Sequence, residues 1–344
     1  MQIIVIGHSA HDSMEWNIAQ ALQQMGHKVS VFPIFSKAFF SDQWMDKAAH
    51  LKNIIPNLEE FLYRDFLHKS IELKPDLIIN TKSELPPRVV TLIKRGCAAK
   101  IAVWYPDHFV SFGRQYVIGA DYDALFFKDE YIVKFFREKL GRKNVFFLPE
   151  ACNPDIHKPV SLSSEDRNRY GCDLTVASNM YYYRARMLEQ FMNYDLKIWG
   201  VSYPRWLDSP IRRCYQFYYV TGEEKAKAFN AAKIVLNTMH YGEILGVNAR
   251  TFEAAGCGGF QIADWKPNMA LFFEPGKEIV TFQSLEELKE KVTYYLAHDS
   301  ERAEIARNAS KRAHKEHTYK ARLTSLLSAV FEDGQGYPMS DHVF

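Results

Sequence analysis

The residues best suited to chemistry lie between positions 243 and 260. Gly246 precedes a short helical pattern, and the first amides of that helix would favour a diphosphate because they add to the positive end of the helix dipole. Arg250 and Glu253 lie three residues apart and share one face of the helix. A carboxylate can accept two hydrogen bonds at once, which suits the vicinal hydroxyls of a ribose. The segment therefore predicts a nucleotide site, with a surface Glu–Arg pair as the alternative.

A second candidate site follows the apolar run at 174–176. Ser178 and Asn179 form a small polar turn before a helical pattern that contains Arg184. Such a turn can bind a phosphate or a ribose, and the arginine could neutralise charge. Serine and asparagine are also ordinary helix caps, so the turn alone is a weak signal.

Two side chains in the first half of the chain could act as a general base. Asp107 follows the apolar run at 101–104, where it could deprotonate a hydroxyl or simply cap the next turn. His8 stands beside Gly7, directly after the first apolar run. Both positions follow a predicted strand, and both are candidates for a catalytic role.

Neither a metal nor a redox cofactor is predicted. His8 and His11 form an H-x-x-H pair, but no third ligand follows at a useful spacing. Asp121 and Asp123 form a D-x-D sequence just before an apolar run, and we interpret them as a polar turn. The first loop contains one glycine, whereas a dinucleotide site would show G-x-G-x-x-G.

The elements that must position these residues are short strands alternating with helices. Continuous apolar runs, such as those at 3–6 and 77–79, are typical of parallel strands covered by helices on both faces. Residues 1 to about 155 read as one doubly wound α/β domain, and the polar segment 159–169 reads as a linker. The alternation then restarts, which predicts a second doubly wound domain. Ligands of such sheets bind at the carboxyl ends of the strands, in a cleft that the two domains would share.

Composition narrows the class of protein. The 344 residues suggest two domains, and a hydrophobic fraction of 47% excludes a disordered chain. A formal net charge of +2 argues against a protein that coats nucleic acid or anionic membrane. Five widely spaced cysteines favour reduced, buried thiols. The sequence shows no apolar run of membrane-spanning length and no signal-peptide pattern, so we predict a cytoplasmic protein without a transmembrane segment.

Three segments resemble the C-terminal half of GT-B glycosyltransferases, and more narrowly the CgeB-like, spore-protein-like branch. They are 246–260, 273–278 and 317–322. The segment 147–154 is similar to the interdomain segment of that family. Ser178-Asn179 with Arg184, and Trp199-Gly200, resemble its donor-site loops. The N-x-R-x-F-E-x-x-A/G-C-G-G signature is matched by Asn248, Arg250, Phe252, Glu253, Cys257, Gly258 and Gly259.

The resemblance implies an α/β protein of the GT-B fold, with two facing Rossmann-like domains. The N-terminal, acceptor domain would contain residues 1–158, with about 320–344 crossing back to pack on it, and the donor domain would contain 159–319. It also implies a nucleotide-sugar donor, no cofactor and usually no catalytic metal.

The resemblance also suggests roles for individual residues. Glu253 matches the glutamate that holds the donor ribose, and Asn248 and Arg250 match positions near the diphosphate. Many retaining relatives carry two glutamates separated by seven residues, whereas nine residues separate Glu243 from Glu253 here. The catalytic role of Glu243 and the choice between retaining and inverting chemistry therefore stay open.

The leading interpretation is a metal-independent transfer of a sugar from a nucleoside diphosphate sugar to an acceptor bound by the first domain. The acceptor could be a glycan, a protein, a small molecule or DNA. The alternatives are a nucleotide-sugar epimerase of the same architecture and a catalytically silent binding or structural protein. The aromatic-rich segment 203–219 could form an acceptor lid or belong to the core.

Overall fold

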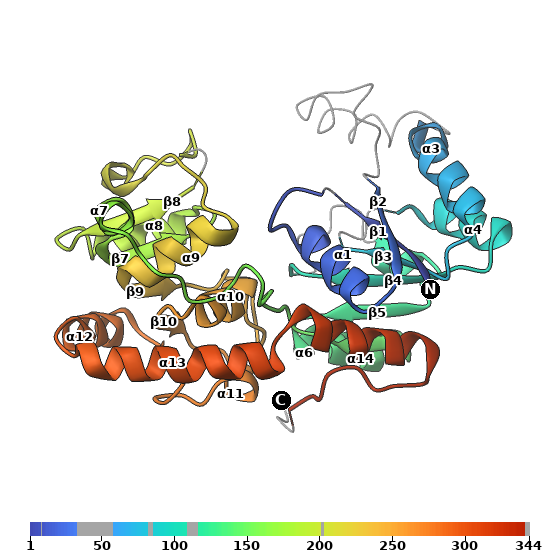
Figure 1. Ribbon diagram of the computed structural model, residues 1–344. Helices are drawn as coiled ribbons and strands as arrows, with labels where there is room; N and C mark the ends of the chain where they lie inside the picture. The colour runs from blue at the N-terminus through green and yellow to red at the C-terminus, as the bar shows by residue number, and fades with distance from the viewer. Residues whose placement is uncertain (8, 33–57, 82–84, 109–115, 201–202, 341–344) are drawn as a thin grey trace. The chain divides into compact units, whose positions relative to one another are not determined.

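The computed structural model describes residues 1–7, 9–32, 58–81, 85–108, 116–200 and 203–340 (Figure 1). The chain divides into two compact units, of which the first contains Met1–Leu148 and Leu323–Met339, and the second contains Pro149–Arg322. The chain passes between them at Leu148–Pro149, whereas the sequence pattern placed the boundary at 158–159. The polar segment that suggested a linker instead begins a helix, α7 (Ser164–Tyr170), which Ser163 and Asp166 cap reciprocally.

The first unit is built on a parallel sheet. Within the described residues the strand order is β2-β1-β3-β4-β5-β6, with all neighbours parallel. The apolar runs in β1, β3 and β5 are buried, as expected for strands with helices on both faces. The strands are β1 (Gln2–Ile6), β2 (Lys28–Phe32), β3 (Leu77–Asn80), β4 (Lys100–Tyr105), β5 (Ala124–Phe127) and β6 (Val145–Phe147). The helices are α1 (Met14–Gln24), α3 (Leu58–Leu73), α4 (Pro87–Gly96), α5 (Tyr116–Gly119) and α6 (Glu130–Leu140).

The end of the chain returns to this first unit. The last helix, α14 (Tyr319–Phe331), leads into residues that run beside β6. The amide of Tyr337 donates to the carbonyl of Phe147 at 2.9 Å, and the two rings meet edge to face at 5.9 Å. Gly336 has a φ of +74°, and an added Cβ would lie 2.9 Å from Phe146, so the glycine permits this close approach.

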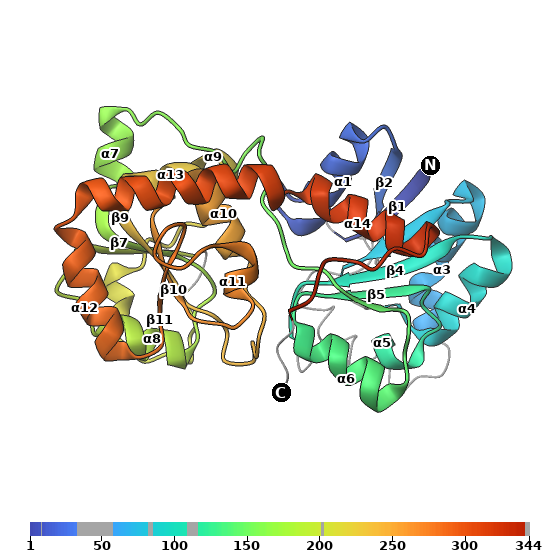
Figure 2. The same cartoon turned by 90° about the horizontal axis from the view of Figure 1, so that it is seen from below.

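The second unit contains another parallel sheet (Figure 2). Within the described residues its strand order is β11-β10-β9-β7-β8, and all neighbours are parallel. The strands are β7 (Cys172–Ala177), β8 (Leu196–Trp199), β9 (Ala232–Asn237), β10 (Gln261–Asp264) and β11 (Val280–Phe282). The helices after α7 are α8 (Tyr182–Glu189), the 3-10 helix η2 (Pro210–Cys214), α9 (Gly222–Ala231), α10 (Ala249–Cys257), α11 (Met269–Phe272), α12 (Leu285–Leu296) and α13 (Asp299–Glu316).

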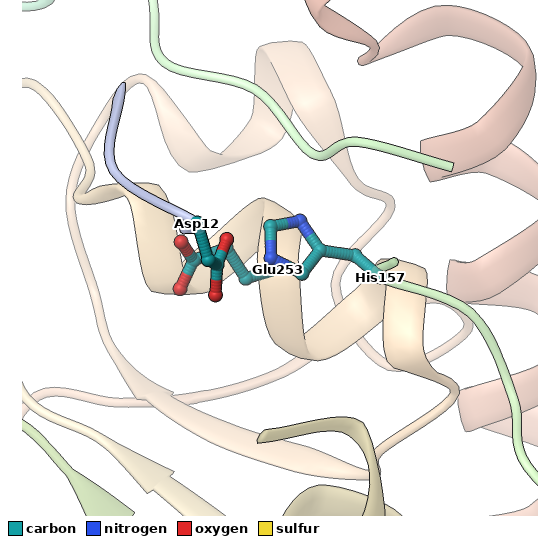
Figure 3. Close-up of side chains that lie close together, drawn as sticks. All are labelled: Asp12, His157 and Glu253. Carbon is teal, nitrogen blue, oxygen red and sulfur yellow. The ribbon is translucent and has the colours of Figure 1, made fainter. Parts of the chain in front are cut away.

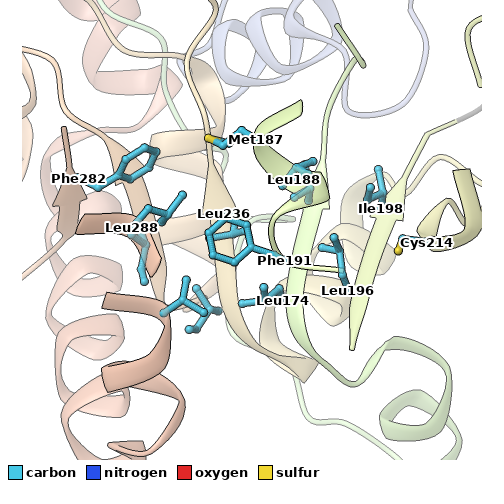
Figure 4. Close-up of a cluster of buried hydrophobic side chains, with 14 of the residues drawn as sticks. Leu174, Met187, Leu188, Phe191, Leu196, Ile198, Cys214, Leu236, Phe282 and Leu288 are labelled. Atoms are coloured by element: carbon cyan, nitrogen blue, oxygen red, sulfur yellow. The ribbon is translucent and has the colours of Figure 1, made fainter. Parts of the chain in front are cut away.

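Alternate side chains of the second sheet enter two different cores. Leu174 of β7 and Leu236 of β9 pack with Leu188 of α8 and Leu288 of α12, as Figure 4 shows. Val235, one residue earlier in β9, enters a second cluster with residues of α7, α9 and α10. Since successive side chains of a strand point to opposite faces, helices cover both faces of this sheet. Parallel Rossmann-like α/β architecture is thereby confirmed for both units.

Hydrogen bonds join the two ends of the second unit. The amide of Cys152 donates to the carbonyl of His317 at 2.9 Å, and the amide of Tyr319 donates back to the carbonyl of Cys152 at 3.1 Å. The buried Arg322 donates from Nε to the carbonyl of Glu150 at 3.2 Å. The segment that enters the unit and the segment that leaves it are therefore paired side by side.

Several further sequence predictions can be compared with the structure. All five cysteines are free thiols, and only Cys97 is not buried. Asp121 and Asp123 lie just before β5, and both carboxylates lie within 3.3 Å of Lys94 Nζ. Among the described residues, no helix combines the length and apolar character that crossing a membrane requires.

Candidate functional site

The strand order of the second unit reverses between β7 and β9. β8 lies on one side of β7, whereas β9, β10 and β11 follow in succession on the other side. In open parallel sheets, ligands bind at such a reversal, outside the carboxyl ends of the strands. β7 ends at Ala177 and β9 at Asn237, so Ser178 and Thr238 are the first residues beyond the sheet. These two loops mark the candidate site.

Helix α10 follows β9, and a buried polar network fixes its first turn. Asn248 caps the helix, because its Oδ1 accepts the amide N–H of Thr251 at 3.1 Å. The Nδ2 of Asn248 donates to Oδ1 of Asn237 at 2.9 Å. Asn237 in turn donates to Thr251 Oγ1 at 3.0 Å and to Gln261 Oε1 at 3.2 Å. Asn248 therefore positions the amides of α10, which are the groups expected to meet a diphosphate.

Replacing Asn248 with alanine should lower the free energy of unfolding by about 1–2 kcal/mol, because the cap is lost and Asn237 loses a buried partner. Thr221 provides a matched control, since it also occupies an N-cap position, at α9, but its side chain makes no capping bond. Thr221→Ala should change the free energy by less than about 0.5 kcal/mol. Urea denaturation of both variants measures the difference, and equal losses would contradict the assigned role of Asn248.

Arg184 is a buried cation that joins the two loops. Its Nε donates to Thr238 Oγ1 at 2.5 Å and its Nη2 to the carbonyl of Thr238 at 2.9 Å. Its Nη1 donates to the carbonyl of Asn179. Burial, with the charge of Arg250 as a second cause, lowers the pKa of Arg184 to about 10. Arg184 thus remains charged at neutral pH and holds the loops after β7 and β9 together.

Arg250 stands in the first turn of α10 and is partly buried. Within the part of the chain that the structure describes, it forms no hydrogen bond and no close ion pair. Burial lowers its pKa, and the nearby carboxylate of Glu253 acts in the opposite direction. A desolvated guanidinium whose donors are unused suits a diphosphate, which can accept two parallel hydrogen bonds. Arg250 is therefore the side chain in this site best prepared for an anionic ligand.

Glu253 lies one turn further along α10 and is paired with a lysine. Its Oε1 lies 3.1 Å from Nζ of Lys225 on α9. A carboxylate oxygen of Glu253 also lies within 4.8 Å of a ring nitrogen of His157, which precedes α7 (Figure 3). Asp12, also drawn in Figure 3, belongs to the first unit.

The remaining predicted donor-site residues are Ser178 and Asn179, which follow β7, and Trp199 and Gly200, which lie at the end of β8. Ser178 is buried, and its Oγ has no hydrogen-bond partner among the described residues, whereas the Asn179 side chain is exposed. Trp199 is a core residue whose indole N–H donates to Thr175 Oγ1 at 2.9 Å, which leaves its ring no polar atom for a ligand. An added Cβ at Gly200 would lie 1.9 Å from Oη of Tyr215, so a side chain at this position would displace the Tyr215 ring.

The three catalytic candidates lie in different places. Asp107 is exposed and follows β4 of the first unit. His8 lies outside the described residues. Glu243 is buried in the loop between β9 and α10, and its carbonyl accepts a hydrogen bond from Nζ of Lys266 at 2.8 Å.

The aromatic segment 203–219 is neither wholly core nor wholly surface. Tyr215 is buried and contacts Tyr203 edge to face at 5.6 Å. Trp206, Phe217 and Tyr218 are exposed.

Sequence reasoning missed Lys225, Thr238 and Asn237. Asn237 and Thr238 follow an apolar run, and polar residues at the end of a predicted strand could have been recognised as site residues. Lys225 carries no such signal, because its role depends on how α9 packs against α10.

The chain is similar to one family model and to one curated protein. A family model described as "Glycosyl transferase-like" matches residues 184–328. The spore protein CgeB of Bacillus subtilis (strain 168) is 20% identical over 289 residues, which cover 78% of this chain and 86% of the relative.

The fold is also similar to solved structures. Sucrose-phosphate synthase from Thermosynechococcus elongatus matches 97% of this chain and 100% of its own, with a TM-score of 0.69 and 13% identity. Anabaena Alr3699/HepE in complex with UDP matches 96% of this chain and 100% of its own, with a TM-score of 0.61 and 14% identity. At these identities the likeness shows the fold, which is GT-B. The family match over residues 184–328, the likeness to CgeB and the GT-B fold all agree with the resemblance that the signature in α10 suggested.

Proposed function

We propose that the second unit holds a nucleoside diphosphate sugar without a metal ion, and that the sugar passes to a hydroxyl of an acceptor held by the first unit. The observation that carries the proposal is the uncommitted, desolvated guanidinium of Arg250 in the first turn of α10. The first amides of that helix and the buried hydroxyl of Ser178 are further donors. They lie where the strand order reverses. These groups are donors, as an anionic ligand requires.

The chemistry of the leaving group explains why these donors matter. Breaking the bond between the anomeric carbon and the diphosphate leaves negative charge on the diphosphate oxygens. Preorganised donors stabilise that charge more strongly in a desolvated site than in water. Arg250, the amides of α10 and the more remote charge of Arg184 would supply the positive charge that a metal ion supplies in other transferases.

The ribose would be held by Glu253, whose carboxylate can accept hydrogen bonds from two vicinal hydroxyls. The HepE structures contain UDP and, in another complex, UDP-glucose. UDP is therefore the first nucleotide to test with this chain, and UDP-glucose the first donor. In an inverting reaction, Asp107 would take the proton of the acceptor hydroxyl.

Calorimetric titration with UDP tests the proposal. Glu253→Gln should weaken UDP binding about 10-fold or more, because hydrogen bonds to a charged acceptor are lost. Glu223 on α9, whose side chain is 72% exposed, provides the control, and Glu223→Gln should bind UDP as the native chain does. Unchanged UDP affinity in Glu253→Gln would overturn the donor-site assignment.

Incubation with UDP-glucose in the absence of an acceptor tests the reaction class. A glycosyltransferase should release glucose and UDP slowly, as water replaces the acceptor. An epimerised sugar would instead favour the epimerase.

A further inference from the structure

Lys225 and Glu253 form a buried ion pair between α9 and α10. Their side chains are only 8% and 14% exposed, and Nζ lies 3.1 Å from Oε1. Lys227, two residues further along α9, pairs with Asp166 while it remains 25% exposed. Removal of two charges from water is costly, and a buried pair often stabilises a fold no better than apolar residues would. Stability alone therefore does not explain why this pair is buried.

The surroundings leave one oxygen of the carboxylate available. Nδ1 of the buried His157 accepts the amide N–H of Asn153 at 3.0 Å, so the proton of the neutral ring lies on Nε2. Within the described ranges, Oε2 of Glu253 accepts no hydrogen bond. One oxygen is thus paired with Lys225, and the two lone pairs of the other can accept hydrogen bonds from two ligand hydroxyls.

Four titratable groups of the second unit act on Glu253. Lys225 comes from α9 and Arg250 from its own helix, α10. His157 and Cys152 come from the segment that precedes α7. Burial raises the pKa of the Cys152 thiol to about 12, so Cys152 is neutral over the working range of pH. Lys225 forms the close ion pair that holds the carboxylate in place.

We propose that Lys225 is a positioning residue, which selects ribonucleotide donors by holding the Glu253 carboxylate oriented toward the 2′-hydroxyl and 3′-hydroxyl groups of the ribose. The inference rests on the proposed function of the site. Without Lys225, the carboxylate would lose the contact that fixes its orientation. A carboxylate that adopts several orientations would meet the two hydroxyls less often, and discrimination between ribose and deoxyribose would decrease.

The test compares the affinities for UDP and 2′-deoxy-UDP by calorimetry at neutral pH. Both nucleotides carry the same diphosphate, so the ratio of their dissociation constants reports the ribose contact. The native chain should prefer UDP about 10- to 100-fold. Lys225→Met should reduce this preference to about 3-fold or less. Lys225→Arg, which retains the charge, should keep most of the preference.

Two further variants separate the possible failures. Lys227→Met, on the same helix, should keep the native ratio. If Glu253→Gln retains the full preference for UDP, the proposed ribose contact is wrong. If Glu253→Gln loses the preference but Lys225→Met keeps it, Lys225 has no positioning role. Lys225→Gln replaces Lys225→Met if the latter does not fold, with the same expected ratios.

Discussion

Replacing Arg250 with methionine should weaken the binding of UDP about 10- to 100-fold, because a diphosphate loses charge-assisted hydrogen bonds. The rate of UDP-glucose hydrolysis should fall further, by about 100- to 1,000-fold, because the charge on the leaving diphosphate is greatest in the transition state. Calorimetry measures the affinity and release of UDP measures the rate. Arg186 on α8 is the control, since it is exposed and already paired with Glu189 at 3.1 Å.

The stability of the Arg250→Met variant provides an independent check. Arg250 forms no hydrogen bond within the described residues, and burial lowers its pKa. In the nucleotide-free protein, its desolvated charge therefore lowers the free energy of unfolding. The variant should therefore be as stable as the native chain, or more stable, in the absence of nucleotide. A loss of stability accompanied by unchanged UDP affinity would show that Arg250 is a structural residue.

Arg184 and Arg250 illustrate how much of the site the sequence can predict. Both arginines were assigned to the same anionic ligand, Arg184 from the polar turn after a predicted strand and Arg250 from the resemblance of its segment to the family signature. The structure gives them different tasks, since Arg184 is committed to Thr238 and Asn179 whereas Arg250 has donors to spare. Composition and spacing place an arginine near a site, but they do not show which backbone carbonyls it satisfies.

The fold was more predictable than the site. Apolar runs such as Ile3–Ile6 and Ile234–Leu236 became central strands because a parallel sheet covered on both faces requires continuous apolar segments. Gly258, with a φ of +78°, ends α10, as a glycine in the left-handed conformation commonly does. These are local signals, and each can be read within about ten residues.

Contacts between distant segments were not predictable in the same way. The Lys225–Glu253 pair joins residues 28 positions apart on two helices, and the network of Asn237, Thr251 and Gln261 joins two strands to a helix. Such contacts depend on the register of packing between elements, which a single sequence does not specify.

The buried ring of His317 should make the free energy of unfolding depend on pH. The ring is fully buried and contacts Phe252 and Phe273 at 5.4 and 5.1 Å. One nitrogen, Nε2, lies 2.8 Å from the carbonyl of Phe272, and Nδ1 lies 3.1 Å from Nη2 of Arg322. Because the guanidinium can only donate, Nδ1 accepts, and the neutral ring carries its proton on Nε2.

Burial, with the charge of Arg322 as a second cause, lowers the pKa of His317 to about 3. The pKa in the folded state therefore lies below the value of about 6.5 in the unfolded chain. The neutral ring contributes its full stability above pH 6.5, and this contribution is lost as the pH falls from 6.5 towards 3. By linkage, the loss at pH 5 amounts to about 2 kcal/mol.

The variant His317→Gln isolates this contribution, because glutamine keeps a donor for Phe272 but cannot be protonated. At pH 8 we expect the variant to be less stable than the native chain by about 1–3 kcal/mol, since Arg322 loses a buried acceptor. At pH 5 the difference in free energy of unfolding between the two proteins should be smaller by about 2 kcal/mol, because only the native chain has a histidine to protonate at this position. Urea denaturation at the two pH values measures both differences, and the other titrating groups cancel in the comparison. Parallel losses in the two proteins would mean that His317 does not govern the sensitivity of this fold to acid.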